Sequence, residues 1–246
     1  MRALLLAAGL GTRLRPLTLT TPKCLVSIQD KPLLDYWLES LFSADIERVL
    51  INTHWLANVV RDHVARSPFR DRIDLVHEDE LLGTGGTILV NRKWFAAGPF
   101  LVAHADNLTN FNVAEFVAAH EQRPPSCVLT ILAFRTDSPT SCGILDIGSQ
   151  GIVTGFHEKI ENPSGDLANA AVYICEPEIA AFIASLGKPN VDFSTEVIPA
   201  FLNRIYAVIT NGYHRDIGTI EALSRAQSEC KTMPPGTLGR ETLRRG

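Results

Sequence analysis

The chain has 246 residues, of which 46% are hydrophobic and 20% are charged, a balance typical of a globular protein with a substantial core. Its net charge of -4 argues against a general nucleic-acid binder, and no apolar run approaches the roughly 20 residues that span a bilayer. The five cysteines show neither CxxC spacing nor a Cys/His pattern for zinc, and the N-terminus lacks a signal-peptide pattern. We therefore expect a cytoplasmic protein without nucleic-acid or membrane partners, and a homo-oligomer remains open.

In the first half, apolar runs alternate with amphipathic segments of helical length. Strands are predicted at residues 2–8, 49–53, 73–77 and 100–105. Helices are predicted at 32–43, 55–66 and 113–121, and another is predicted to follow the Gly-rich 83–86 and to run to about 97. This β-α-β-α order predicts a parallel sheet with right-handed crossovers and helices on both faces.

The second half has closely spaced strands, which indicate an antiparallel insertion. Strands are predicted at 128–134, 143–147, 152–157, 170–175 and 205–209, with helices starting near 177, 194 and 219. The Gly-Ser-Gln-Gly segment at 148–151 predicts a hairpin turn. We expect residues 1–230 to form one domain and residues 231–246, which carry Pro-Pro-Gly and several charges, to form a poorly ordered tail.

The segment LLLAAGLGTRLRPLTLTTPK, residues 4–23, carries the first candidate site. A buried strand ends in glycines, so the backbone can turn sharply and present free N–H groups to a ligand. Arg13 and Lys23 follow, and both suit a polyphosphate. No Gly-Lys-Thr/Ser follows at P-loop spacing, and the third glycine of a dinucleotide-binding fingerprint is missing. A Gly-x-Gly turn alone would be weak support for a phosphate site.

Four later segments carry further candidates, each with an ordinary structural explanation as well. Glycines in ELLGTGGT, residues 80–87, leave a helix start open to a ligand, or form a flexible turn. Asp106 follows a buried strand, where open α/β sheets present ligand-binding groups and where turn residues are also common. Glu158 and Lys159 form an acceptor–cation pair that could equally be a surface ion pair. Asp216 precedes Gly218 and Thr219, which could cap the last helix.

Taken together, these segments resemble the sugar-1-phosphate nucleotidyltransferases, the family of mannose-1-phosphate guanylyltransferase and of glucose-1-phosphate thymidylyl- and uridylyltransferases. The resemblance extends over roughly residues 1–225. It implies a Rossmann-like α/β fold with a mixed, mostly parallel sheet, which agrees with the predicted elements.

The resemblance also implies a role for each motif. Arg13 and Lys23 would hold the phosphates of a nucleoside triphosphate, and Asp106 and Asp216 would bind Mg²⁺, a cation that prefers such hard oxygen ligands. The other roles concern the two substrates. The nucleotide would contact the first loop at Ala8, Gly9, Gly11 and Thr12. Its nucleoside would contact the second glycine segment at Gly83, Thr84 and Gly85. The sugar phosphate would contact Glu158, Lys159 and Asn169.

Two departures from the family pattern are visible. Ala105 stands before Asp106 where the family usually has glycine, and Ile160 follows Lys159 where it often has proline. A small residue is kept in the first case, and the second lies in a loop. Neither change is expected to abolish catalysis.

The implied reaction joins an NTP and a sugar 1-phosphate, giving an NDP-sugar and pyrophosphate. The LGTGG and DIGT segments resemble guanylyltransferases that act on mannose- or manno-heptose-1-phosphate, so GTP is the predicted nucleotide. Uridylyl, thymidylyl or cytidylyl transfer to another sugar 1-phosphate remains open, because base choice depends on few contacts. A catalytically silent nucleotide-sugar sensor is a further alternative, although it would predict loss of Lys23, Asp106 or Asp216, and all three are present.

Overall fold

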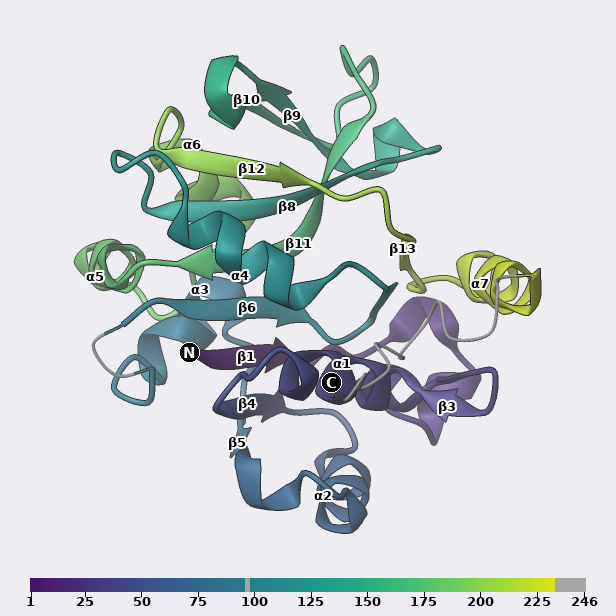
Figure 1. Cartoon of the computed structure of the whole chain (residues 1–246). Helices are drawn as coiled ribbons and strands as arrows, with labels where there is room; N and C mark the ends of the chain where they lie inside the picture. The colour runs from purple at the N-terminus through teal and green to yellow at the C-terminus, as the bar shows by residue number, and fades with distance from the viewer. Residues whose placement is uncertain (96–97, 233–246) are drawn as a thin grey trace, which may run out of the picture. The chain divides into compact units, whose positions relative to one another are not determined.

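The computed structural model describes residues 1–95 and 98–232, and these divide into two compact units. Of the described residues, unit 1 consists of those in 1–4, 80–103 and 114–211, and unit 2 of those in 5–79, 104–113 and 212–232. Strand β1 (Arg2–Leu6) passes from the first unit into the second. The labelled helices and strands can be followed in Figure 1.

Unit 2 contains a β-α-β crossover. Strands β4 (Arg48–Thr53) and β5 (Ile73–His77) pair in parallel, and α2 (Ala57–Arg66) lies between them in the chain. Helix α1 (Leu33–Ser43) begins directly after Pro32, which has no N–H to lose at a helix start. Five apolar residues that recur at helical spacing along it are buried, namely Leu33, Leu34, Trp37, Leu38 and Leu41.

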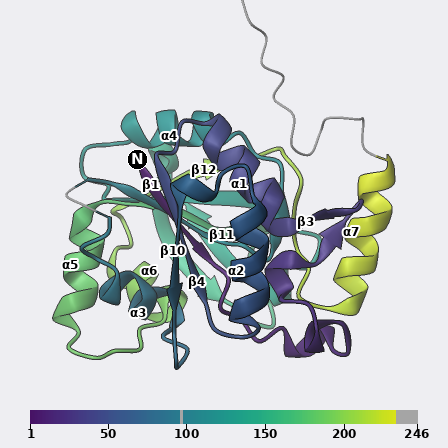
Figure 2. The same ribbon diagram turned by 90° about the horizontal axis from the view of Figure 1, so that it is seen from below.

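Two small antiparallel pairs complete unit 2. Strands β2 (Ser27–Ile28) and β3 (Lys31–Pro32) form a tight hairpin, and β7 (Asn107–Thr109) pairs with β13 (His214–Asp216). Helix α7 (Ile220–Thr232) lies beside the β2–β3 hairpin (Figure 2). Its Ala226 and Cys230 are buried in an apolar cluster with Val26, Ile28, Leu33, Tyr36, Leu108 and Ile217.

The mixed sheet of unit 1 combines a parallel pair with an antiparallel insertion (Figure 1). Strand β12 (Ile205–Ile209) pairs in parallel with β8 (Leu129–Arg135), and β8 pairs antiparallel with β11 (Leu167–Cys175). On its other edge β11 contacts β6 (Phe100–His104) and β9, also antiparallel. The insertion is the antiparallel hairpin of β9 and β10, at Gly143–Ile147 and Val153–Glu158.

Helices follow several of these strands in the chain. They are α3 (Gly83–Val90), α4 (Val113–Glu121), α5 (Pro177–Ser185) and the short α6 (Ile198–Ala200), which directly follows a π-helical turn at Phe193–Val197. Ile179 and Ile183 are four residues apart on α5, so they share one face, and both are fully buried.

The predicted α/β class, with its mixed sheet and antiparallel insertion, is confirmed, and most element bounds agree within two residues. The helix predicted to follow residues 83–86 and to run to about 97 has the wrong bounds, because α3 already begins at Gly83 and ends at Val90. Residues 96–97 of that prediction lie outside the described residues. Strand β11 begins at Leu167, three residues before the predicted start, and it has a bulge between Asn169 and Tyr173. The sequence analysis missed β2, β3, β7 and β13, which have only two or three residues each. Of the predicted tail, Lys231 and Thr232 belong to α7, and 233–246 lie outside the described residues.

Within the described ranges, no helix combines the length and the apolar character that crossing a bilayer would require.

Candidate functional site

The glycine loop of residues 7–11 follows β1 in unit 2, and its shape is fixed from both ends. The backbone N–H of Ala7 donates to Oδ1 of buried Asn52 (2.7 Å), and the Thr18 hydroxyl donates to the Gly11 carbonyl (2.7 Å). Gly11 has a φ of 61°, and a Cβ there would lie 2.9 Å from the Thr18 methyl group. Glycine is therefore required at this position by both conformation and space.

Gly9 has open space beside it, unlike Gly11. A Cβ built at Gly9 meets no atom within 4 Å, so this residue borders open space where a ligand could approach the backbone. Short 3₁₀ turns follow the loop at Thr12–Leu14, Leu17–Leu19 and Lys23–Leu25, in place of the helix of a P-loop or dinucleotide-binding motif. Thr12 and Arg13 are exposed on the first turn, and Ala8 is buried beneath the loop.

Lys23 brings together two carboxylates that are far apart in the chain. Its Nζ donates to Oδ2 of Asp106 (2.6 Å) and to Oδ1 of Asp216 (2.9 Å). Asp106 follows β6, where the Ala105 N–H donates to the Leu6 carbonyl (3.0 Å), and Asp216 ends β13, opposite Asn107 of β7. The fold of unit 2 thus assembles the predicted cluster of Lys23, Asp106 and Asp216.

Arg13 lies at the edge of this cluster. Its Nη2 is 4.0 Å from Oδ2 of Asp216, and both side chains are more than half exposed. A Cβ at Gly218 would lie 2.8 Å from the same Nη2, so glycine leaves room for the guanidinium. Being exposed and loosely paired, Arg13 is free to turn toward an incoming anion.

The charges of the cluster stabilise each other. Burial alone would lower the pKa of Lys23, but Asp106 and Asp216 outweigh it, and the pKa rises above its usual value. Burial would raise the pKa of Asp106, but Lys23, with a contribution from His104, lowers it. At neutral pH the cluster therefore contains an ammonium and an ionised Asp106.

Asp106 and Asp216 are the two carboxylates that the Lys23 ammonium joins. Among the described residues, no group of three or more His, Cys, Asp and Glu side chains could hold a metal ion. A cation bound here would have two protein carboxylates and would need its remaining ligands from substrate and water.

Two supporting residues of the loop were missed by the sequence analysis. Asn52 accepts from Ala7 and donates to Oε1 of buried Glu78 (3.0 Å), and Nε1 of Trp55 donates to the Thr18 carbonyl (2.8 Å). A signal was available for Asn52, because it is a polar residue near the carboxyl end of an apolar strand, as Asp106 is. Nothing in the sequence marked Trp55.

In unit 1, the second glycine segment forms the start of α3. Gly83 has a φ of 70°, and the N–H of Gly85 donates to the Val191 carbonyl (2.9 Å). A Cβ at Gly85 would lie 2.8 Å from that oxygen, and one at Gly86 would lie 2.4 Å from the Pro189 carbonyl. Close packing against residues 189–191 therefore explains Gly85 and Gly86. The predicted nucleoside contacts at Gly83, Thr84 and Gly85 remain predictions.

The predicted sugar-phosphate residues lie on the insertion and on β11. Glu158 ends β10, Lys159 follows it with a φ of 50°, and Lys159 Nζ is 3.1 Å from Oε1 of Glu158. The amide of Asn169 donates to the Tyr173 hydroxyl (2.8 Å) and accepts from the N–H of Ala171 (2.8 Å). Burial raises the pKa of Tyr173, whose hydroxyl stays protonated. In this structure Asn169 stabilises the β11 bulge.

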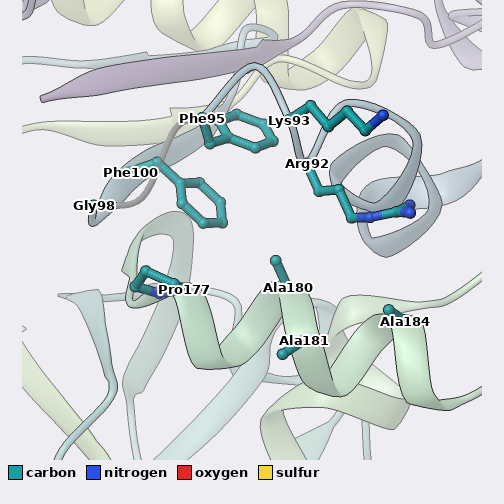
Figure 3. Close-up of a pocket in the computed structure, with 9 residues that line it drawn as sticks. All are labelled: Arg92, Lys93, Phe95, Gly98, Phe100, Pro177, Ala180, Ala181 and Ala184. Atoms are coloured by element: carbon teal, nitrogen blue, oxygen red, sulfur yellow. The ribbon is translucent and has the colours of Figure 1, made fainter.

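A separate cavity of about 350 Å³ in unit 1 contains none of the predicted site residues. It lies between α5 and the segment that leads from α3 to β6 (Figure 3). The aromatic rings of Phe95 and Phe100 stack 4.2 Å apart on one side, and Ala180 faces them from α5. This cavity gives no support to the predicted site.

These observations define an α/β protein whose glycine loop leads into a Lys–Asp–Asp cluster. The chain belongs to the Nucleotidyl transferase family, whose profile it matches over residues 2–232. It is 30% identical to the mannose-1-phosphate guanylyltransferase catalytic subunit beta of Drosophila pseudoobscura pseudoobscura, over 97% of this chain and 67% of the relative.

Solved structures agree with this assignment. HddC from Yersinia pseudotuberculosis, crystallised with GMP-PN, superposes with a TM-score of 0.77 at 28% identity, over 93% of this chain and 99% of that one. UDP-glucose pyrophosphorylase with bound UDP-glucose superposes with a TM-score of 0.80 at 23% identity, over 94% and 98% of the two chains, and shows the same fold. The resemblance to sugar-1-phosphate nucleotidyltransferases predicted from the motifs is confirmed.

Proposed function

We propose that this chain transfers a guanylyl group from GTP to mannose-1-phosphate or manno-heptose-1-phosphate, forming a GDP-sugar and pyrophosphate. The observation that carries the proposal is the convergence of Lys23, Asp106 and Asp216 near Arg13 in unit 2. GTP is favoured because the relative from Drosophila is named a guanylyltransferase and HddC was crystallised with a guanosine phosphate analogue.

The reaction needs no general base from the protein. A phosphate oxygen of the sugar 1-phosphate, already ionised at neutral pH, attacks the α-phosphorus of GTP. A new P–O bond forms there, the bond between the α-phosphorus and the bridging oxygen breaks, and pyrophosphate leaves with that oxygen. No proton has to be removed from the nucleophile.

The main obstacle is electrostatic, since two polyanions must meet. Charged oxygens 4 Å apart repel by about 1 kcal/mol in bulk water and by about 4 kcal/mol at an effective dielectric constant near 20. Arg13 and Lys23 would hold the triphosphate and stabilise the leaving pyrophosphate, and Lys159 would hold the sugar phosphate. Glu158 and Asn169 would then accept or donate hydrogen bonds to the sugar hydroxyls.

The two carboxylates fit a divalent cation. Asp106 and Asp216 are hard oxygen donors, and both already contact one positive group, the Lys23 ammonium. We therefore include Mg²⁺, held by Asp106 and Asp216, in the proposal. When bound, it would offset the phosphate charges and polarise the α-phosphoryl group.

A cytoplasmic location is part of the same proposal. All five cysteines are free thiols in the structure, as expected for a reducing compartment. Fractionation of cells that express the tagged chain would test this, and recovery in the periplasmic or secreted fraction would contradict it.

The substrate proposal is tested by measuring pyrophosphate release with GTP, UTP, dTTP, CTP and ATP, each against a panel of sugar 1-phosphates. We expect the highest kcat/KM for GTP with mannose-1-phosphate or manno-heptose-1-phosphate. A higher value for another pair would replace the substrates but keep the reaction class. Silence across the panel, with NTP binding intact, would instead favour a nucleotide-sugar sensor.

A further inference from the structure

The strand that carries Asp216 is short, and its own pairing gives it little stability. Strand β13 has three residues and, among the described residues, forms a two-stranded sheet with the three-residue β7. An isolated two-stranded ladder is at best marginally stable. Asp216 nevertheless has to meet Asp106 and Lys23 within hydrogen-bonding distance. Something beyond the ladder must fix its position.

Glu229 of α7 contacts β13 and the residue before it. It accepts two hydrogen bonds from Arg215, from Nε to Oε2 (2.9 Å) and from Nη2 to Oε1 (3.0 Å), a forked geometry that is both strong and directional. The Tyr213 hydroxyl donates to the same Oε2 (2.6 Å). Arg215 is only 18% exposed, so this ion pair is better shielded than an ordinary surface pair.

The residues of α7 on either side of Glu229 are packed or hydrogen-bonded, which fixes the position of Glu229. Cys230, the next residue, is buried in the apolar cluster with Ile28 and Tyr36. Two residues before Glu229, Gln227 donates from Nε2 to the Ser27 carbonyl (2.7 Å). The contacts on both sides of Glu229 hold it against the β2–β3 hairpin.

The ends of β13 are attached to the segment around β7. Before the strand, the Asn110 N–H donates to the Tyr213 carbonyl (3.1 Å), and the Tyr213 N–H donates to Oδ1 of Asn110 (2.5 Å). After the strand, the Ile217 N–H donates to the Asp106 carbonyl (3.4 Å). Because side chains alternate along a strand, Arg215 points away from the face that carries Asp216.

From these contacts we propose that Glu229 is a positioning residue for Asp216, acting through Arg215 and Tyr213 and without touching the substrates. It fixes β13 from the face opposite the reaction site, and the fixed strand places the Asp216 carboxylate beside Asp106. The proposal rests on the proposed function only in assigning a bound cation and phosphates to Asp216.

The test compares Glu229→Gln with Asp74→Asn in the full chain. Asp74 accepts a similar forked pair of hydrogen bonds from Arg48 (2.9 and 2.8 Å) in the same unit, on β5 and away from β7 and β13 in the sheet order. Two quantities are measured: hydrogen exchange of the peptide 212–218 by mass spectrometry, and the dissociation constant of Mn²⁺ by electron paramagnetic resonance.

For Glu229→Gln we expect amide exchange in 212–218 to become about 10-fold faster and Mn²⁺ binding to weaken about 10-fold. For Arg215→Lys we expect both quantities to change in the same directions. Asp74→Asn should leave both quantities at the wild-type value. Unchanged exchange and unchanged Mn²⁺ binding in a folded Glu229→Gln protein would overturn the proposal. If the wild type binds no Mn²⁺ and turns over no NTP, the proposed function fails, while the exchange measurement still decides whether Glu229 positions β13.

Discussion

The predicted phosphate-side and sugar-side residues differ in how the chain holds them. In unit 2, Lys23, Asp106 and Asp216 come from three distant segments, and Lys23 donates a hydrogen bond to each carboxylate. In unit 1, Glu158 and Lys159 are neighbours in sequence, and the Asn169 side chain bonds Ala171 and Tyr173 of its own strand. The first group is built by the tertiary fold, and the second by local chain geometry.

The two lysines make this difference concrete. The side chain of Lys23 is 10% exposed and pairs with two carboxylates, whereas that of Lys159 is 64% exposed and pairs with one. A buried ammonium is tolerated only with such partners, so Lys23 is fixed before any substrate binds. An exposed pair such as Lys159–Glu158 contributes at most about 1 kcal/mol and can reorganise around a ligand.

The largest effect is expected for Lys23→Ala. Removing the ammonium leaves Asp106 and Asp216 facing each other and removes a cation for the triphosphate, so kcat should fall by about 100- to 1,000-fold. Steady-state pyrophosphate release measures this. Lys231→Ala, an exposed lysine on α7, is the control and should match the wild type. Near wild-type turnover of Lys23→Ala would remove the reason for treating this cluster as the reaction centre.

A smaller and more selective effect is expected for Lys159→Ala. If Lys159 holds the sugar phosphate, KM for the sugar 1-phosphate should rise about 10-fold, the loss of one charge-assisted contact, while KM for the NTP stays unchanged. The matched control is Lys188→Ala, because Lys188 is a half-exposed lysine of unit 1 that pairs with Glu196. Equal changes in both KM values would show that Lys159 is not specific to the sugar side.

The third prediction concerns stability rather than turnover, and it lies outside both groups. Burial, reinforced by Arg123, lowers the pKa of His120 from 6.5 to about 4, and the ring bonds Thr130 through Nδ1 (2.7 Å). The unfolded chain therefore takes up this proton first as the pH falls. The contribution of the neutral His120 ring to the free energy of unfolding is complete above pH 6.5. It is lost as the pH falls from 6.5 to 4, and the loss is about 3 kcal/mol at most.

Urea unfolding at pH 7 and pH 4.5 measures the loss in the wild type and in His120→Gln. The variant should be less stable at pH 7 but should lose less stability between the two pH values. An equal loss in both proteins would show that other groups account for the pH dependence.

The sequence predicted the long elements well because their periodicity follows burial directly. The five core residues of α1 and the strand at 73–77 are examples. Helix α3 was predicted to start and to end too far along the chain. The glycines at 83–86 were expected to precede the helix, whereas they form its first turn, and the chain turns at Asn91 after Val90. The two-residue and three-residue strands β2, β3, β7 and β13 were missed, because pairing at this length depends on tertiary neighbours that the sequence does not reveal.

The candidate site shows the same limit. Motif spacing located Lys23, Asp106 and Asp216, but only the fold reveals that one ammonium bridges both carboxylates. Asn52 and Glu229 were missed because each acts on a neighbouring segment and belongs to no motif. Conversely, Gly85 was predicted as a nucleoside contact, and the structure provides a packing role through Val191.

The most direct test of the central claim, that the Lys23–Asp106–Asp216 cluster is the reaction centre, is the turnover of Asp106→Asn in a Mg²⁺ titration. Asparagine keeps the shape of the side chain but loses the charge that pairs with Lys23 and would bind the cation. We predict that kcat stays about 100-fold or more below the wild type at saturating Mg²⁺. Near wild-type turnover at saturating Mg²⁺ would contradict the account.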